Sequence, residues 1–233
     1  MRVPKHLAII PDGNRRWARK RGLPTFEGHR RGFDRAIEIV KKARELGIHT
    51  VTLWAFSTEN WKRTKKEVSY LMKLYEIMID KFLPEARKDR VKIIHLGRKD
   101  RIPQSLKKKI ERAEEETKNY QAHVLNIALD YGGRDEILRA VIRMMDHLRG
   151  GRRDSSEVKL TEQEFSQYLD TAGMPDPDLI IRTGGEKRLS GFMLWQCQYS
   201  ELYFTKTLMP DFGPKELEKA IKDYSKRQRR FGK

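Results

Sequence analysis

The stretch His6–Gly22 has the sequence HLAIIPDGNRRWARKRG, and it joins a short apolar run to a turn and a strongly basic segment. The run HLAII predicts a strand that is covered on both faces, and the turn predicts a helix that begins near Asn14. Arginines interleaved with Trp17 are typical of a nucleic-acid contact surface. Asp12, the one acid of the stretch, would repel phosphates at that surface unless a metal ion lay between them. The rest of the chain has to decide between these interpretations.

Short apolar runs alternate with amphipathic helical patterns along the chain. The runs predict strands at His6–Ile10, Thr50–Phe56, Val91–Leu96, His123–Leu129, Asp178–Arg182 and a late pair at Phe192–Trp195 and Leu202–Phe204. Helical spacing recurs over residues 36–46, with Gly47 as the stop, over 68–82, with a break near Pro84, and over 137–148. The alternation predicts one α/β domain over residues 1–233 with a mainly parallel sheet. Residues 149–159 predict an exposed, mobile loop.

The composition limits the class of protein. The chain has 233 residues, enough for a substantial core, and its mean hydropathy of −0.77 is that of a soluble protein. No apolar run approaches the roughly 18 residues of a membrane span, and the N-terminus enters a strand-like run directly, so we expect no signal peptide. The single cysteine, Cys197, excludes an intrachain disulfide and a multi-cysteine zinc site, which favours a reducing, cytoplasmic setting.

The net charge of +17 calls for an anionic partner. Nucleic acid, an anionic membrane and phosphorylated substrates all fit that charge, and a solvated basic surface without a specific partner is the plain alternative. The net charge therefore indicates a polyanionic partner but does not identify which one.

Polar clusters follow several predicted strands, where ligands of a parallel sheet bind. After the first strand, Gly13 and a helix start at Asn14 would bring backbone N–H groups to an anion, and Arg15 and Arg16 add charge. This is either a diphosphate cradle or a capping turn on a basic surface helix; the Walker A pattern is absent.

Two further clusters carry hydroxyls, amides and charges. The loop AFSTENWKRTKKE, residues 55–67, can position a metal-bound phosphate and a proton, or it is a helix start with a packing tryptophan. In residues 180–204, Arg182, Arg188 and Ser190 suit diphosphate oxygens, and Glu201 is a second carboxylate that can join Asp12 at a magnesium ion. The alternative there is a basic loop before an aromatic core strand.

The remaining candidates predict structural roles. The segment NIALDYGGRDE, residues 126–136, predicts a tight strand-to-helix turn. The histidines show no HExxH spacing. His95 and His123 lie on apolar runs and are expected in the core or at strand ends.

The segments HLAIIPDGNRRWA, HRRG, LWAFSTENWKR, NIALDYGGRDE, DLIIRTGGEKRLSGFMLWQCQYSELYF and RRFGK, in this order, closely resemble the cis-prenyltransferase family, best known for undecaprenyl diphosphate synthases. The resemblance covers nearly the whole chain. It implies a Mg²⁺-dependent enzyme that condenses isopentenyl diphosphate onto an allylic diphosphate, with cis double bonds. It also implies a mostly parallel six-stranded sheet flanked by helices, an apolar tunnel and a homodimer.

The same resemblance implies roles for individual residues. Asp12 matches the essential carboxylate at the magnesium–diphosphate, Asn60 the proposed proton acceptor, and Glu201 a magnesium ligand. The positions that match substrate-binding residues are Gly13, Asn14, Arg15, Arg16, Trp17, His29, Ser57, Thr58, Glu59, Trp61, Arg63, Arg182, Arg188, Leu189, Ser190, Arg230 and Gly232. Thr25 stands where several members have an arginine, and Lys187 replaces a histidine that is sometimes a metal contact.

Three expectations stay open at this stage. An eleven-unit product for a glycan carrier lipid is the default, with a shorter product or a geranylgeranyl primer as alternatives. A nucleic-acid-binding module and a catalytically silent partner subunit are the competing classes; nucleic acid is not the expected partner. Weak, peripheral attraction to anionic membrane is expected from the charge.

Overall fold

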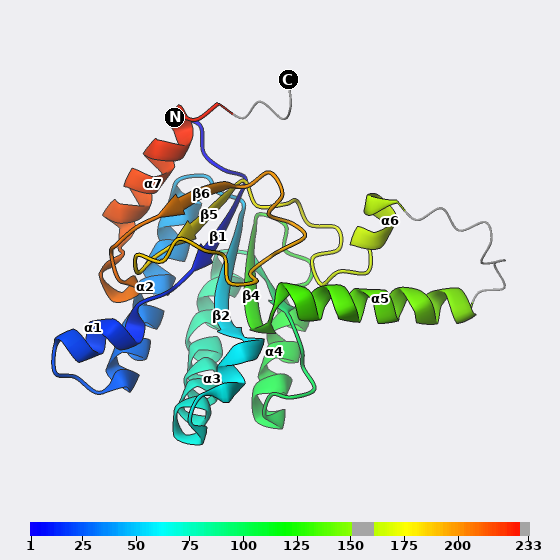
Figure 1. Ribbon diagram of the computed structural model, residues 1–233, viewed down its shortest axis with the longest axis horizontal. Coiled ribbons are helices and arrows are strands. Elements are labelled where there is room, and N and C mark those ends of the chain that lie inside the picture. The colour runs from blue at the N-terminus through cyan, green and yellow to red at the C-terminus, as the bar shows by residue number, and fades with distance from the viewer. Residues whose placement is uncertain (151–160, 229–233) are drawn as a thin grey trace.

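The apolar run at the N-terminus forms β1 (His6–Ile10), and all five of its residues are buried. The computed structural model describes residues 1–150 and 161–228, and it places β1 in the interior of the sheet (Figure 1). On one side β1 pairs in parallel with β2 (Thr50–Ser57), and on the other with β5 (Leu179–Arg182). A strand with neighbours on both sides and helices or turns on both faces has to be apolar throughout, which explains the run.

The described strands form one six-stranded sheet in the order β3-β4-β2-β1-β5-β6, and every neighbouring pair is parallel. The other strands are β3 (Val91–Leu96), β4 (His123–Tyr131) and β6 (Glu201–Phe204). This confirms the predicted α/β class and the parallel sheet, with strand ends shifted by at most two residues for the first five runs. The carboxyl ends of β1, β2 and β5, after which the predicted clusters lie, are neighbours.

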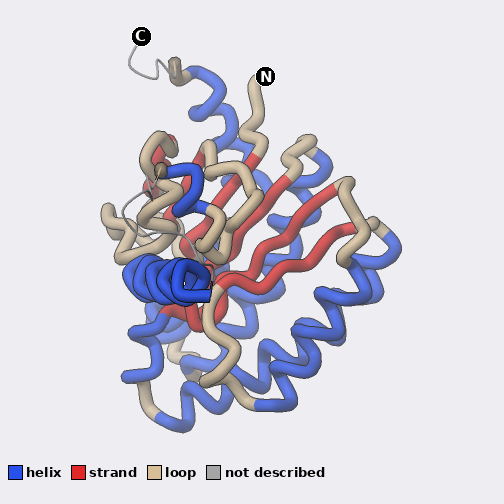
Figure 2. The backbone as a smooth tube through the Cα atoms, turned by 90° about the vertical axis from the view of Figure 1, so that its right-hand side faces the viewer, coloured by secondary structure: helices blue, strands red, loops and turns tan. Residues whose placement is uncertain are grey.

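Helices cover the sheet on both sides (Figure 2). The large helices on one face are α2 (Thr25–Glu45), α3 (Lys65–Lys88), α4 (Gln104–Thr117) and α7 (Pro214–Lys226). The other side carries α5 (Gly133–Gly150), α6 (Glu162–Ser166) and a turn-rich segment. Shorter elements near the strand ends are α1 (Asn14–Lys20), η1 (Thr58–Lys62) and η3 (Met209–Asp211).

No helix within the two described ranges is long and apolar enough to cross a membrane. Most of the loop predicted at 149–159 lies outside the described residues.

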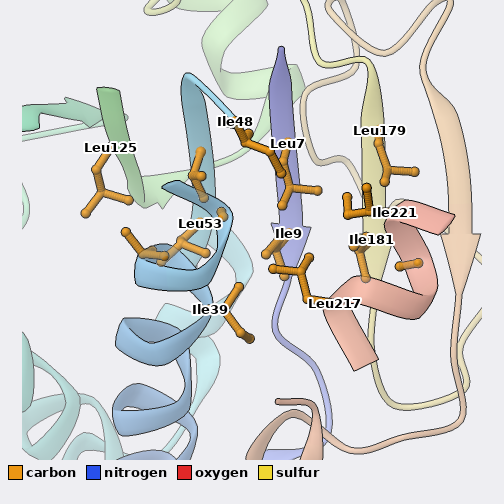
Figure 3. Packing of buried hydrophobic residues seen from close by; sticks show 14 of the residues in the cluster. Leu7, Ile9, Ile39, Ile48, Leu53, Leu125, Leu179, Ile181, Leu217 and Ile221 are labelled. Carbon is orange, nitrogen blue, oxygen red and sulfur yellow. The ribbon is translucent and has the colours of Figure 1, made fainter. Parts of the chain in front are cut away.

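The largest apolar cluster joins the sheet to α2 and α7 (Figure 3). Leu7 and Ile9 of β1 lie against Ile39 of α2 and Leu217 of α7, and all four are fully buried. Complete burial of one such side chain stabilises the fold by about 1.5–3 kcal/mol. This cluster packs the sheet against the two helices and reaches the cavity through Val40 and Leu53.

The predicted break near Pro84 is wrong, because α3 continues through the proline to Lys88. Proline lacks the N–H that would bond the preceding turn, which costs about 3 kcal/mol inside a helix. The turn that contains it buries Leu83 and Ala86 almost completely. Burial on both sides of the proline offsets the lost hydrogen bond.

The strand predicted at Phe192–Trp195 is also wrong, because these residues form turns. Gly191 and Met193 have φ angles of 89° and 46°, which no β-strand adopts. The apolar side chains of the segment pack on the sheet from a turn and not from a strand. The Phe192 ring stacks on Trp54 of β2 with 4.9 Å between ring centroids, so the turn covers the sheet.

Candidate active site

Asp12 lies just beyond the carboxyl end of β1, between two arginines. Its carbonyl oxygen accepts hydrogen bonds from Thr183 Oγ1 at 2.7 Å and from the backbone N–H of Met209 at 3.0 Å, which fixes the turn. Its carboxylate pairs with Arg182 Nη2 at 3.1 Å and with Arg16 Nη2 at 3.2 Å. Arg16 belongs to α1 and Arg182 ends β5. The first and fourth predicted clusters therefore meet at this carboxylate.

Arg182 is buried and joins the turn-rich segment to Asp12. Its Nη1 donates to Ser190 Oγ at 2.8 Å and to the carbonyl oxygen of Arg188. Its Nε is buried without a hydrogen-bond partner among the described residues, and so is Asn14 Oδ1. Buried polar atoms are normally paired. Arg182 and Asn14 both line the same cavity.

Glu67, at the start of α3, lies close to three basic side chains. Its Oε1 lies 3.2 Å from His29 Nε2, 3.1 Å from Arg63 Nη1 and 3.9 Å from Arg15 Nε. Burial lowers the pKa of His29, so its imidazole is neutral near pH 7 and Nε2 donates its proton to Glu67. We did not predict Glu67 from the sequence, because its spacing after Thr64 is that of an ordinary helix start.

The loop after β2 is held in a defined shape. Asn60 Oδ1 accepts a hydrogen bond from the Ser57 backbone N–H at 3.3 Å, and Thr58 Oγ1 donates to Glu59 Oε1 at 3.1 Å. A Cβ atom at Gly132 would lie only 2.6 Å from Thr58 Oγ1. The glycine turn after β4 therefore closes against this loop, which explains that motif structurally.

Trp61 is anchored outside the cavity by a second unpredicted carboxylate, Asp130. Trp61 Nε1 donates to Asp130 Oδ1 at 2.8 Å, and Arg101 Nε donates to Oδ2 at 2.8 Å. Asp130 is fully buried and has a φ angle of 53°, an unusual value that brings its side chain beneath the loop. These two hydrogen bonds hold the loop that carries Trp61.

A cavity of about 360 Å³ begins at these polar groups and runs between the sheet and helices α2, α3 and α4. The predicted site residues that line it are Asp12, Asn14, His29, Ser57, Asn60, Arg63, Arg182 and Ser190. Deeper in, its walls are mainly apolar and include Phe33, Val40, Phe82, Ala113 and Ile127. The hydroxyl of Tyr75 donates to the carbonyl oxygen of Ala55 at 2.6 Å, so the tyrosine presents an apolar ring. A polar mouth thus opens into an apolar interior.

Other predicted residues lie on the same turns without lining the cavity; they are Gly13, Arg15, Arg16, Thr58, Glu59, Arg188 and Leu189. Gly13 has a φ angle of 107°, and a Cβ atom there would lie 2.8 Å from Leu208 Cδ2, so only glycine fits. Arg188 Nη1 lies 2.5 Å from Glu186 Oε2 at the surface. Arg230 and Gly232 lie outside the described residues.

Two predicted residues lie elsewhere. Trp17 is buried, and its Nε1 donates to Asp211 Oδ1 at 2.7 Å, so it packs α1 against η3. Glu201 begins β6 opposite Leu179, which itself lies opposite Leu7. The strand residues Ala8–Ile10 and the turn at Pro11 therefore lie between the level of Glu201 and Asp12. Glu201 pairs with Arg227 at 2.8 Å.

Thr25, the position where several family members have an arginine, is the exposed first residue of α2. Arg21 pairs with Asp211 at 3.3 Å and Arg30 with Glu27 at 2.7 Å. Neither side chain lines the cavity.

The fold and the site define an α/β enzyme with an anion-binding mouth above an apolar cavity. The family model Prenyltransf, described as "Putative undecaprenyl diphosphate synthase", matches residues 10–232. An isoprenyl transferase of Thermotoga maritima is 51% identical over 232 residues, which cover 100% of this chain and 98% of the relative. One from Aquifex aeolicus is 48% identical, with 100% and 97% covered.

Two solved structures share the fold. Lavandulyl diphosphate synthase from Lavandula x intermedia, in complex with dimethylallyl diphosphate, matches with a TM-score of 0.94 and 37% identity over 99% of both chains. A probable undecaprenyl diphosphate synthase from Campylobacter jejuni matches with a TM-score of 0.80 and 35% identity over 100% of both. The chain belongs to the cis-prenyltransferase family, and it is a prenyltransferase enzyme.

Proposed function

We propose that the enzyme condenses isopentenyl diphosphate onto an allylic diphosphate, farnesyl or geranylgeranyl diphosphate, to make a long-chain cis-polyprenyl diphosphate. The observation that carries this proposal is the cavity itself, whose mouth holds Asp12 and Arg182 and whose interior is apolar. A ligand that fills both parts has a charged head and a hydrocarbon tail. An eleven-unit product for a glycan carrier lipid is the default that the family resemblance supplies.

Asp12 fits the role of a Mg²⁺ ligand. Within residues 1–150 and 161–228 no three His, Cys, Asp or Glu side chains are grouped to hold a metal ion. Mg²⁺ is commonly bound by one or two carboxylates together with water and substrate phosphates, so a single carboxylate at a diphosphate site suffices. Bound there, the ion would neutralise charge on the departing diphosphate. The family resemblance assigns Glu201 as a further ligand of that ion.

The side chains at the mouth of the cavity have different roles in substrate binding and proton transfer. Arg182 Nε is an unpaired donor that a diphosphate oxygen would satisfy, and Arg63 and Arg16 add positive charge for two diphosphates. As the allylic C–O bond breaks, the isopentenyl double bond attacks the allylic carbon and forms the new C–C bond. The cation that results then loses a proton. Asn60 orients the path of that proton, and a diphosphate oxygen or water accepts it, because an amide is a very weak base.

We assign the enzyme a homodimer through α5. Leu138, Ile142 and Met145 are 65%, 58% and 42% exposed, and their spacing places them on one face of that helix. Figure 1 shows α5 extending outward from the end of β4. Sedimentation should give twice the 27.6 kDa mass of the chain, and Ile142→Asp should give the single mass. A wild-type monomer at assay concentration would refute the dimer.

The test of the proposed reaction is chain elongation. The enzyme would be incubated with labelled isopentenyl diphosphate and a panel of allylic primers, with Mg²⁺ or with a chelator. We expect butanol-soluble, labelled polyprenyl products with Mg²⁺ only, and chromatography of the dephosphorylated products gives their length. Failure to elongate any primer, short or long, would overturn the proposal.

A further inference from the structure

The corner between α1 and α2 is exposed, basic and apolar at once. All eight residues 19–26, here called the α1–α2 corner, are exposed. Arg19 and Lys20 form no ion pair with a described residue, and residues 13–26 include no acid. Leu23 is 41% exposed and Phe26 46% exposed. Figure 1 shows this corner projecting from the lower edge of the molecule, on the side of the strands' carboxyl ends.

The first turns of α3 extend this surface. The rings of Phe26 and Tyr70 lie 5.6 Å apart, and Tyr70 Oη donates to the carbonyl oxygen of Phe26 at 3.3 Å. One helical turn before Tyr70, Lys66 is exposed, as are Lys62 and Lys65, and none of the three has an ion-pair partner among the described residues. Cations without an ion-pair partner therefore lie on both helices that carry exposed Phe26 and half-buried Tyr70.

Two aromatic pairs lie between α2 and α3, one at this surface and one at the cavity. Phe33 follows Phe26 by two turns of α2, about 10 Å along the helix. Its ring lies 5.1 Å from that of Tyr75 of α3, and both rings line the cavity. The seam between α2 and α3 thus carries one aromatic pair on the cavity wall and another at the exposed corner.

These properties fit a lipid surface better than a nucleic acid. Cations are sufficient to bind a phosphate backbone, and the exposed side chains of Leu23 and Phe26 would add no affinity for it. An anionic bilayer satisfies both features, because headgroups attract the cations and the interface accepts the apolar side chains. Exposed apolar groups rimmed by polar ones are typical of such contacts.

We propose that the α1–α2 corner and the start of α3 dock on anionic membrane, so that the seam between α2 and α3 faces the lipid. The inference rests on the proposed function, since a long polyprenyl product has to pass from the cavity into a bilayer.

The test is vesicle flotation with the full-length enzyme. Vesicles of phosphatidylcholine, with or without a minor share of phosphatidylglycerol, would be used at low and at physiological salt. Two double variants address the corner: Arg19→Glu with Lys20→Glu, and Leu23→Ser with Phe26→Ser. Matched controls on the opposite edge are Lys88→Glu with Lys222→Glu, and Tyr199→Ser. We expect each corner variant to lower the partition coefficient for anionic vesicles at least about tenfold, and the controls to change it by no more than about twofold.

Several outcomes would overturn the docking surface. Equal losses in the control variants would show that net charge alone drives partitioning. Unchanged vesicle binding in both corner variants, together with weaker binding of a short DNA duplex, would assign the corner to nucleic acid. Elongation assayed in detergent micelles keeps the two proposals apart: an inactive wild type refutes the reaction, whereas active corner variants that no longer float support docking.

Discussion

Asp12 and Arg182 lie 3.1 Å apart across the ends of β1 and β5, and this ion pair joins the two halves of the mouth. Arg182 also holds Ser190 and the carbonyl of Arg188, so one guanidinium fixes both the carboxylate and the turn-rich segment. A side chain with a planar fork of donors is needed for that geometry.

Arg182→Lys should therefore lower kcat/KM for isopentenyl diphosphate about 100-fold, because one ammonium group cannot reach all three partners at once. Arg21→Lys is the matched control, since Arg21 pairs with Asp211 at the surface, and we expect it to keep nearly full activity. Steady-state kinetics with both substrates gives the comparison. Equal activity of Arg182→Lys and wild type would contradict the proposed role of the guanidinium.

Asn60→Ala should reduce kcat much more than it weakens diphosphate binding. The side chain lines the cavity and its Oδ1 is already oriented by the Ser57 N–H, so it is placed to guide a proton. Single-turnover rates and equilibrium binding of the allylic diphosphate separate the two effects. Parallel losses in rate and affinity would mean that Asn60 serves binding alone.

Ala113→Leu should shorten the product. Ala113 lies on α4, is almost fully buried and lines the apolar interior, so a larger side chain takes space from the hydrocarbon tail. Ala140→Leu is the control, because Ala140 is equally buried in a cluster between α5 and α6 that is separate from the cavity. Overpacking costs each variant about 1–3 kcal/mol of stability. Products of equal length from both variants would contradict the tunnel.

Acid should destabilise the protein partly through His6 and His95. Burial lowers the pKa of each imidazole from 6.5 to about 4. The unfolded chain therefore takes up protons first, and stability is lost as pH falls from about 6.5 towards 4. At pH 5 this amounts to about 2 kcal/mol for each residue.

His95→Leu should remove the part of the acid-induced loss of stability that His95 causes. Urea unfolding at pH 7.5 and at pH 5 measures the difference, and the variant should gain about 2 kcal/mol relative to wild type on going to the lower pH. Other acid-sensitive groups cancel in this comparison, because they are present in both proteins. An identical pH dependence would show that His95 is protonated in the folded state.

The sequence predicted the parts of the fold that depend on local pattern. The buried run at β1 and the alternation with helices were sufficient for the class and for the position of the first loops, because parallel strands align their carboxyl ends. A four-residue apolar run such as Phe192–Trp195 is not a reliable strand, since a turn covering a sheet has the same composition.

The candidate site was predictable only in part. The loop residues that line the mouth follow strand ends, and that is why Asp12, Asn60 and Arg182 were found. Glu67 and Asp130 were missed because their partners come from other elements of the chain. Glu201 begins β6 and pairs with Arg227, and its predicted part in a magnesium site stays a prediction.

The most direct test of the central claim is incorporation of labelled isopentenyl diphosphate by the wild type and by Asp12→Asn in one experiment, with farnesyl diphosphate and Mg²⁺. The substitution keeps the size of the side chain and removes its charge. We predict labelled polyprenyl diphosphate from the wild type and at least about a 100-fold lower rate from Asp12→Asn. Equal incorporation by the two proteins would contradict the account.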